Sequence, residues 1–318
     1  MRAHDRRTAI GLGVATLVLA LAVARCAEQQ EAPEDRTAAP DTALGGASAD
    51  SFAIADVGFE TPESVLHDPD ADVYLVSNIG GDPLDRDDTG FIARLSPDGS
   101  VEQLRWIDGA SETVTLHAPK GMALRGDTLY VADIDTVRAF HRVTGAPVRA
   151  IGVPGATFLN DVAAGDDGAL YVTDSGLTAG FAPSGTDAVY RIDGARPTVV
   201  AEGEALSRPN GITVTDDALV IAPFADDALL RIAPDGGAPL PGDSLPAGQL
   251  DGVVELADGG FLVSSWGGGA IYRVNGGDVI TTLVDGLDAP ADIGFDERRG
   301  RVLIPLFNEN RVEVRTLR

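Results

Sequence analysis

From Phe52 onward the chain alternates short apolar segments with tight polar turns, and no stretch has the spacing of an amphipathic helix. One four-strand pattern recurs: a strand, a turn rich in Gly and Asp, a strongly apolar strand, a third strand and a weaker outer strand. In the first repeat the three clearest strands are Ser64–His67, Val73–Val76 and Phe91–Leu95. The pattern predicts an all-β protein built from antiparallel sheets of four strands.

Each repeat opens with a short motif whose central residue follows Pro or Leu. The central residues are separated by 57, 40, 50, 41 and 40 positions, a period typical of repeat architectures. The motifs are Pro62-Glu63-Ser64, Pro119-Lys120-Gly121, Leu159-Asn160-Asp161, Pro209-Asn210-Gly211, Leu250-Asp251-Gly252 and Pro290-Ala291-Asp292. Six repeats of four strands predict a six-bladed β-propeller. Two stacked β-sandwich domains are the rival architecture, but they do not explain the period.

The last repeat lacks an outer strand, because the sequence ends at Arg318. The apolar segment 52–57 can supply it. We therefore expect an N-terminal strand to close the ring and to remove two exposed sheet edges. This assigns residues 52–318 to the propeller.

The N-terminus has a different character. Arg2, Arg6 and Arg7 precede an apolar run at 9–24, which is short for a membrane span and typical of a signal sequence. We expect residues 1–26 to direct export to the periplasm or the extracellular space, with an uncleaved membrane anchor as the alternative. Arg25 directly before Cys26 disfavours lipidation. Residues 27–51 hold few bulky apolar groups and are expected to form a disordered linker.

Charge excludes several classes of partner. The chain carries a net charge of −25, and its single cysteine cannot form an intrachain disulfide. An acidic surface repels nucleic acid and anionic lipid headgroups. We therefore expect a monomer that binds a small molecule and no nucleic acid, with membrane contact only through the N-terminal segment if that segment is uncleaved.

Loop lengths indicate where the site lies. In an antiparallel blade, the first strand begins on the face where the second strand ends. The long loops 79–90, 107–118, 177–187 and 239–249 are all expected on that face, together with the six motifs. Long loops gather at functional rims, so the mouth of the central channel is the predicted site.

The six central residues would form a ring at that mouth. Four of them, Glu63, Asn160, Asn210 and Asp251, offer the oxygen ligands that Ca²⁺ prefers. Mn²⁺, Mg²⁺ and Zn²⁺ are alternatives, although the absence of Cys and His from the ring disfavours Zn²⁺. The competing interpretation is that these residues only begin strands in a wet channel.

Three further residues are candidates for substrate binding. Lys120 is the only lysine of the chain and occupies a ring position. It would hold an anionic group or an oxyanion of the substrate, or form a structural ion pair with a carboxylate such as Asp133. His117 near the mouth is a candidate general base or substrate contact, and Trp266 would wall the pocket. An ordinary loop histidine and a packing tryptophan are the alternatives.

At these motifs the chain resembles the senescence marker protein/gluconolactonase/luciferin-regenerating enzyme family and, more distantly, diisopropyl fluorophosphatase. The likeness covers about residues 58–310 and lies in Pro62-Glu63-Ser64, Asn160-Asp161-Val162, Arg208-Pro209-Asn210-Gly211-Ile212 and the stretch from Asp251 to Gly267. It implies that Glu63, Asn210 and Asp251 bind a catalytic divalent ion. It also implies that Asn160 is a ligand or a substrate contact, and that Asp251 is the base. Lys120 departs from the family pattern, as does the context of Glu63, which lacks the usual Gly-Pro and the following aromatic residue.

The resemblance implies hydrolysis of lactones, or of phosphoesters in the distant branch. A Ca²⁺-dependent lactonase, in which Asp251 assists proton removal from water, is thus the first hypothesis. The alternatives are a non-catalytic binding propeller of the NHL-like kind and a propeller whose axial metal is purely structural.

Overall fold

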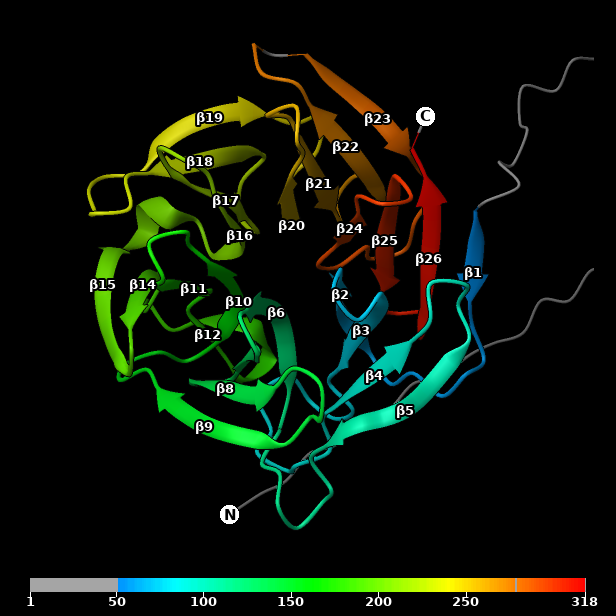
Figure 1. Cartoon of the computed structure of the whole chain (residues 1–318). Coiled ribbons are helices and arrows are strands. Elements are labelled where there is room, and N and C mark those ends of the chain that lie inside the picture. Colours follow the sequence, from blue (N-terminus) through cyan, green and yellow to red (C-terminus); the bar gives the residue numbers. More distant parts are fainter. Residues whose placement is uncertain (1–50, 278, 318) are drawn as a thin grey trace, which may run out of the picture. The chain divides into compact units, whose positions relative to one another are not determined.

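The computed structural model describes residues 51–277 and 279–317. The predicted signal or anchor segment and the linker up to residue 50 lie outside this part of the chain. Six antiparallel sheets of four strands surround a central axis (Figure 1), which confirms the predicted six-bladed propeller. Among the described residues, no helix is long and apolar enough to cross a membrane.

Each blade runs from an innermost to an outermost strand. Blade 1 consists of β2 (Pro62–Asp68), β3 (Val73–Asn78), β4 (Phe91–Leu95) and β5 (Val101–Asp108). Blade 2 consists of β6 (Pro119–Arg125), β7 (Thr128–Asp133), β8 (Thr136–His141) and β9 (Pro147–Gly152). Blade 3 consists of β10 (Leu159–Ala164), β11 (Leu170–Asp174), β14 (Ala188–Asp193) and β15 (Arg196–Glu202). Blades 4 and 5 consist of β16 (Pro209–Val214), β17 (Leu219–Pro223), β18 (Ala228–Ile232) and β19 (Leu240–Ser244); and β20 (Leu250–Glu255), β21 (Phe261–Ser265), β22 (Ala270–Val274) and β23 (Ile280–Val284).

Blade 6 combines the two ends of the described chain. Its strands are β24 (Gly294–Asp296), β25 (Arg301–Leu306), β26 (Arg311–Thr316) and the N-terminal β1 (Phe52–Ile54). In the antiparallel pairing Phe52 lies opposite Val314 and Ile54 opposite Val312, and Figure 1 shows β1 in blue beside β26 in red. The ring is therefore closed by the N-terminal strand, as predicted.

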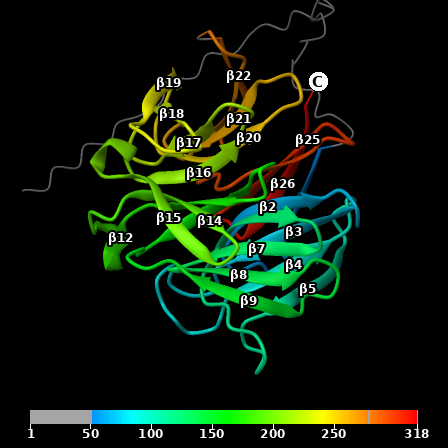
Figure 2. The ribbon, with the colours of Figure 1, turned by 60° about the vertical axis from the view of Figure 1, so that its left-hand side comes forward.

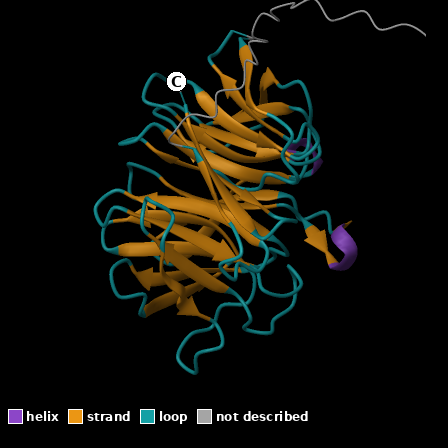
Figure 3. Cartoon of the chain, turned by 90° about the vertical axis from the view of Figure 1, so that its right-hand side faces the viewer, coloured by secondary structure: helices purple, strands orange, loops and turns teal. Residues whose placement is uncertain are grey.

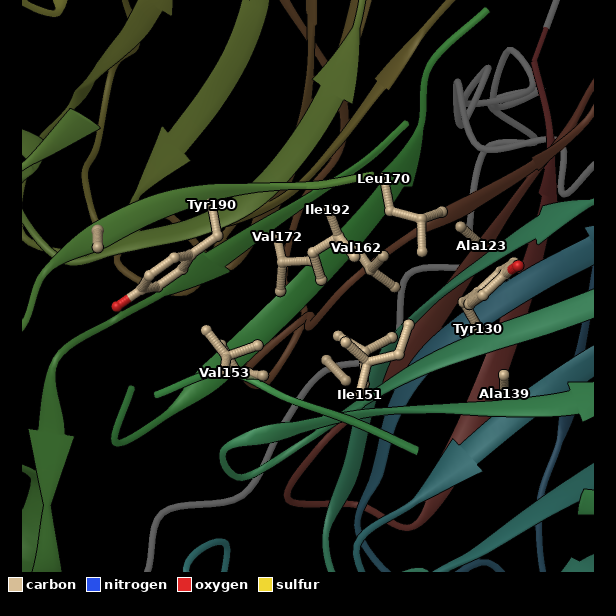
Figure 4. Packing of buried hydrophobic residues seen from close by; sticks show 14 residues of the cluster. Ala123, Tyr130, Ala139, Ile151, Val153, Val162, Leu170, Val172, Tyr190 and Ile192 are labelled. Carbon is tan, nitrogen blue, oxygen red and sulfur yellow. The ribbon is translucent and has the colours of Figure 1, made fainter. Parts of the chain in front are cut away.

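The burial of a strand follows its content of apolar side chains and differs between the inner and the outer strands of a blade. All six residues of β3 are buried, whereas the outer strand β15 is mostly exposed. Between neighbouring blades these apolar faces pack together. Figure 4 shows such a cluster between blades 2 and 3, where Val162 and Val172 lie near Ile151 and Val153. Burial of this kind is the main driving force for the fold.

Two loops differ from the simple expectation. Residues 240–244, expected within a long loop, form the outer strand β19, which pairs with β18. The insertion after β11 forms an extra hairpin of β12 (Leu177–Thr178) and β13 (Ala182–Pro183), joined by the single helical turn η1 (Ala179–Phe181). A second helical turn, η2 (Glu204–Leu206), precedes blade 4. Seen from the side, the hairpin projects from the stack of blades (Figures 2 and 3).

Candidate functional site

The six motifs occupy equivalent places in the propeller. In each blade, the residue before the central position lies opposite the last residue of the second strand. The opposed pairs are Pro62 and Asn78, Pro119 and Asp133, Leu159 and Asp174, Pro209 and Pro223, Leu250 and Ser265, and Pro290 and Leu306. The central residues therefore form a true ring around the axis.

A β-bulge follows directly in each of the first five blades. Pairing is interrupted between Pro62 and Ser64 in blade 1, and just after Pro119, Leu159, Pro209 and Leu250 in the next four. Bulges re-aim side chains and are frequent next to active sites. The ring residues of these blades are nonetheless buried: Lys120 is 1% exposed, Asp251 3%, Asn210 4%, and Glu63 and Asn160 5%.

In blades 1, 3 and 5, a hydroxyl side chain hydrogen-bonds to the backbone at the bulge. Each is the penultimate residue of a second strand and accepts the backbone N–H that follows a ring residue. Ser64 N donates to Ser77 Oγ (2.9 Å), Asp161 N to Thr173 Oγ1 (3.0 Å) and Gly252 N to Ser264 Oγ (2.8 Å). Ser77, Thr173 and Ser264 were not among the residues predicted from the sequence. The pattern that could have identified them is a hydroxyl residue at the penultimate position of an otherwise apolar strand.

The ring forms the floor of a cavity of about 370 Å³, within the range of small-molecule sites. Glu63, Lys120, Asn160, Asn210, Asp251 and Trp266 all line it. The structure thus brings together the four predicted metal ligands and two of the predicted substrate contacts. The loops 79–90 and 177–187 contribute Pro83 and Phe181 to its walls.

Several polar atoms of this cavity are buried without a hydrogen-bond partner among the described residues. They are Glu63 Oε2, Asn210 Oδ1, Asp251 Oδ1 and Trp266 Nε1. Trp266 and Asn210 still lie close enough to Asp251 to favour its charged form. Leaving buried polar atoms unpaired costs free energy, and native proteins rarely do so without reason.

These three oxygen atoms are donors of the kind that a hard cation binds. One carboxylate oxygen each from Glu63 and Asp251, with the amide oxygen of Asn210, form a donor set suited to Ca²⁺. Asn160 donates its amide N–H to Ser175 Oγ (3.0 Å), which fixes the orientation of the side chain. The described residues contain no metal-type cluster of three or more His, Cys, Asp or Glu side chains. A cation here therefore depends on amide oxygens as well as on carboxylates.

Negative charge accumulates around the axis. Burial, followed by the charges of Asp251 and Asp292, raises the pKa of Glu63 well above its usual value. Burial and the charge of Asp292 likewise raise the pKa of Asp251 and of Asp161. Each of these carboxylates disfavours the ionisation of the others because the surroundings are poorly solvated. Such a cluster is stabilised by bound protons or by a bound cation.

Asp161 and Asp292 form a second layer, since each directly follows a central ring position in the chain, Asn160 and Ala291 respectively. Ser64 Oγ donates to Asp292 Oδ2 (2.5 Å), and Ile212 N donates to Asp161 Oδ2 (2.8 Å). Burial raises the pKa of Asp292 to about 7, although the hydrogen bond from Ser64 lowers it. Both aspartates line a separate cavity of about 350 Å³ among the inner strands. They were quoted in the motifs but not selected as site residues.

Lys120 is held by neutral groups. Its Nζ donates to Ala118 O (3.1 Å) and Pro83 O (3.2 Å) and lies 4.3 Å from the ring centroid of Phe158. The suggested ion pair with Asp133 is not formed, because that carboxylate accepts from Arg138 Nε (2.8 Å) and from backbone N–H groups. Burial lowers the pKa of Lys120, and the nearby charge of Glu63 opposes this shift.

The structure does not bring His117 into the cavity. Its Nδ1 lies 3.1 Å from Asp88 Oδ1, and its backbone N–H donates to Asp133 Oδ1 (3.2 Å). The residues that line the cavity do not include it. His117 is close to the ring in sequence, but its side chain lies outside the cavity because the backbone N–H groups of His117 and Ala118 are hydrogen-bonded to Asp133.

No protein-family model matches the sequence, and no curated protein sequence matches it. Solved structures resemble its fold. A gluconolactonase from Xanthomonas campestris has a TM-score of 0.64 at 16% identity, covering 88% of this chain and 94% of that one. A streptogramin B lyase has a TM-score of 0.60 at 13% identity, covering 84% and 98%. Virginiamycin B lyase from Staphylococcus aureus, solved with quinupristin, has a TM-score of 0.57 at 16% identity, covering 84% and 99%.

At these identities the likeness shows a shared fold and says nothing about substrate. The structural neighbours of the chain include gluconolactonase-type propellers, the family that the motifs around Glu63, Asn160, Asn210 and Asp251 resemble.

Proposed function

We propose that this protein is a divalent-metal-dependent hydrolase of lactones that uses Ca²⁺. One observation carries the proposal. Glu63, Asn210 and Asp251 come from three different blades, line one cavity and each present a buried oxygen without a hydrogen-bond partner among the described residues. A propeller that only binds a partner through its rim loops has no need for such a convergence.

In the proposed reaction water adds to the lactone carbonyl carbon, the ring C–O bond breaks, and a hydroxy acid is the product. When bound, the divalent ion supplies polarisation of the carbonyl and lowers the pKa of water. Glu63, Asn160, Asn210 and Asp251 are the residues that would hold it. The Asp251 carboxylate accepts the proton that the attacking water loses and passes it to the departing ring oxygen.

The remaining side chains of the cavity orient the reactants. Lys120 keeps its ammonium beside the ring through two carbonyl groups, so it offsets part of the negative charge of Glu63. Trp266 covers one side of the cavity and directs Nε1 towards Asp251. Burial of the ring keeps bulk water away, which strengthens each electrostatic interaction.

Thermal unfolding with Ca²⁺ or with a chelator tests the ion. A ligand at about one hundred times its dissociation constant stabilises the native state by about 2.7 kcal/mol. We expect Ca²⁺ to raise the melting temperature of the wild type and of the control Glu202→Gln, whose side chain is exposed on β15. Glu63→Gln should abolish the effect. An equal Ca²⁺ effect in Glu63→Gln would reject this metal site.

Hydrolysis is tested with a panel of lactones in ¹⁸O-labelled water. The label should enter the product carboxylate, and turnover should stop in chelator and return with Ca²⁺. Binding of Ca²⁺ without turnover of any lactone would indicate a structural metal. Neither binding nor turnover would indicate a non-catalytic binding propeller.

A further inference from the structure

A second set of equivalent positions, which we call the collar, lies at the ends of the second strands, and five of its six members line the cavity. Each collar residue directly follows the second strand of its blade, and these strands surround the axis in Figure 1. The collar consists of Ile79, Ile134, Ser175, Phe224, Trp266 and Phe307. Five of the six are apolar, in contrast to the polar ring beside them.

In blades 4 to 6 the collar residues are aromatic and pack against one another as a wall of the cavity. The ring centroid of Trp266 lies 5.6 Å from that of Phe224, at an interplanar angle of 80°, and 5.2 Å from that of Phe307. All three rings are half-buried and line the cavity. Edge-to-face and tilted contacts of this kind are favourable and keep aromatic rings in place.

Blade 3 supplies a further apolar wall. Phe158 is buried, and its ring centroid lies 6.3 Å from that of Phe181 in the β12–β13 hairpin. Phe181 is 55% exposed although it is a large apolar residue, and Leu177 of the same hairpin also lines the cavity. A ligand that covers these rings removes apolar surface from water, which is favourable.

Ser175, Asn308 and Lys120 line the cavity but are engaged by the protein, whereas Arg208 and Gln249 add polar groups to its lining. Ser175 Oγ donates to Pro209 O (2.7 Å) while it accepts from Asn160. Asn308 Nδ2 donates to Asp288 (3.0 Å), and Lys120 binds two carbonyls. A sugar lactone carries hydroxyl groups on most of its carbons, and those that face the wall of Phe224, Trp266 and Phe307 would be buried against aromatic rings, which is unfavourable.

We infer that the cavity takes lactones, or related cyclic esters, that carry a bulky apolar substituent such as an alkyl chain or an aryl group. This inference rests on the proposed hydrolase function and names its substrate class. The ester group lies at the ring of Glu63, Asn210 and Asp251, and the apolar substituent lies against the collar. Sugar lactones are poor ligands.

Binding can be tested without turnover, with the full chain and its two tryptophans. In a Trp106→Phe background, the fluorescence of Trp266 reports occupation of the collar. The probes are 2-alkylcyclopentanones, which have no ester bond to hydrolyse, and 1,5-anhydroglucitol as the sugar analogue. We expect affinity to rise about three- to fourfold for each added methylene, and no saturation with the sugar analogue.

Variants then locate the bound substituent. Phe224→Ser and Phe307→Ser should weaken binding of 2-octylcyclopentanone by at least about tenfold, since each removes a large apolar contact. The matched control is Phe295→Ser, which changes a half-buried aromatic residue that lines the other cavity. Equal effects in all three variants, or affinity independent of chain length, would overturn the inference.

The activity assay separates this inference from the proposed function. The kcat/KM for γ-alkyl-γ-butyrolactones should rise with chain length and exceed that for D-glucono-δ-lactone. Preference for the sugar lactone would overturn the inference and leave the hydrolase proposal intact. Chain-length-dependent binding of the ketones without hydrolysis of any lactone would uphold the apolar ligand class and reject the hydrolase.

Discussion

Thr173 Oγ1 donates a 2.6 Å hydrogen bond to the backbone carbonyl of Asn210, although Thr173 belongs to blade 3 and Asn210 to blade 4. The same hydroxyl accepts the N–H of Asp161, the residue after ring member Asn160. One side chain thus couples two neighbouring ring positions. Ser264 repeats the arrangement in blade 5, where it accepts from Gly252 N and donates to Ala291 O of the next motif (2.8 Å).

Thr173→Val should therefore both destabilise the propeller and disturb the ring. Valine has almost the same shape but leaves the buried Asp161 N–H and Asn210 carbonyl without this partner, at a cost of roughly 1–3 kcal/mol for each unpaired group. Denaturant unfolding measures the loss, and Ca²⁺ titration measures the weaker ion binding. Thr281→Val, on the exposed outer strand β23, is the control and should change neither. Wild-type stability of Thr173→Val would contradict the coupling.

Gly121→Ala should be strongly destabilising because blade 2 approaches blade 3 closely at this point. A Cβ at Gly121 would lie 2.7 Å from the backbone Cα of Asp161 and closer still to its carboxylate. Forced overpacking costs typically about 1–3 kcal/mol. Gly152→Ala is the matched control, since nothing lies within 4 Å of its Cβ position. Equal unfolding midpoints for the two variants would show that the blades can separate without cost.

Asp251→Asn removes the proposed proton acceptor while it nearly preserves volume. We expect kcat to fall by about 10²- to 10⁴-fold at saturating Ca²⁺, the usual contribution of a general base. Steady-state kinetics with the preferred lactone measures the change, and Asp285→Asn on the exposed surface is the control. Full activity of Asp251→Asn would remove Asp251 from the mechanism.

Acid stability should depend on Asp68, which joins blades 1 and 2. Arg142 Nε and Nη2 donate to its carboxylate at 2.7 and 2.5 Å, and the Asp68 side chain is fully buried. Burial alone would raise the pKa of Asp68, but Arg142 and the N–H groups of Ala71 and Asp70 lower it. A depressed pKa in the folded state contributes stability above the unfolded value of about 3.9, and this contribution is lost as the pH falls through the folded value.

The free energy of unfolding of Asp68→Asn should thus lie about 1–3 kcal/mol below that of the wild type near pH 7. The difference should shrink below about pH 4. The control Asp70→Asn affects a carboxylate that is 79% exposed and also bonded to Arg142 (2.7 Å). It should cost less than about 1 kcal/mol, as exposed ion pairs do. A constant difference between pH 7 and pH 2.5 would refute the linkage.

Much of the architecture could be predicted because it depends on local patterns of apolar and turn-forming residues. The short apolar strands around Val73–Val76 and their counterparts alternate with Gly-Asp turns, and both signals depend only on neighbouring residues. The period of the motifs then implied six equivalent blades. The addition of the N-terminal segment to the last blade was predictable too, because an unpaired outer edge needed a strand, whereas the register that places Phe52 opposite Val314 came from the structure.

The contacts of the site residues at the mouth of the channel were harder to predict from the sequence. Glu63, Asn160, Asn210 and Asp251 were selected because they are oxygen donors at repeated positions, and the cavity unites them. The partners of Lys120 were not foreseen, since Pro83 O belongs to a loop of another blade. His117 was selected from its place beside the ring in sequence, yet backbone contacts to Asp133 hold its loop outside the cavity.

Local side-chain patterns were enough to predict most of the strands, their period, the strand that closes the ring and the six equivalent motif positions. All of these follow from side-chain polarity and turn chemistry along the chain. Three features could be recognised only in the folded protein: the bulges beside the ring residues, the bridge that Thr173 forms between two blades, and the wall of Phe224, Trp266 and Phe307. These features depend on contacts between distant segments, whose distances and directions exist only after the blades have packed.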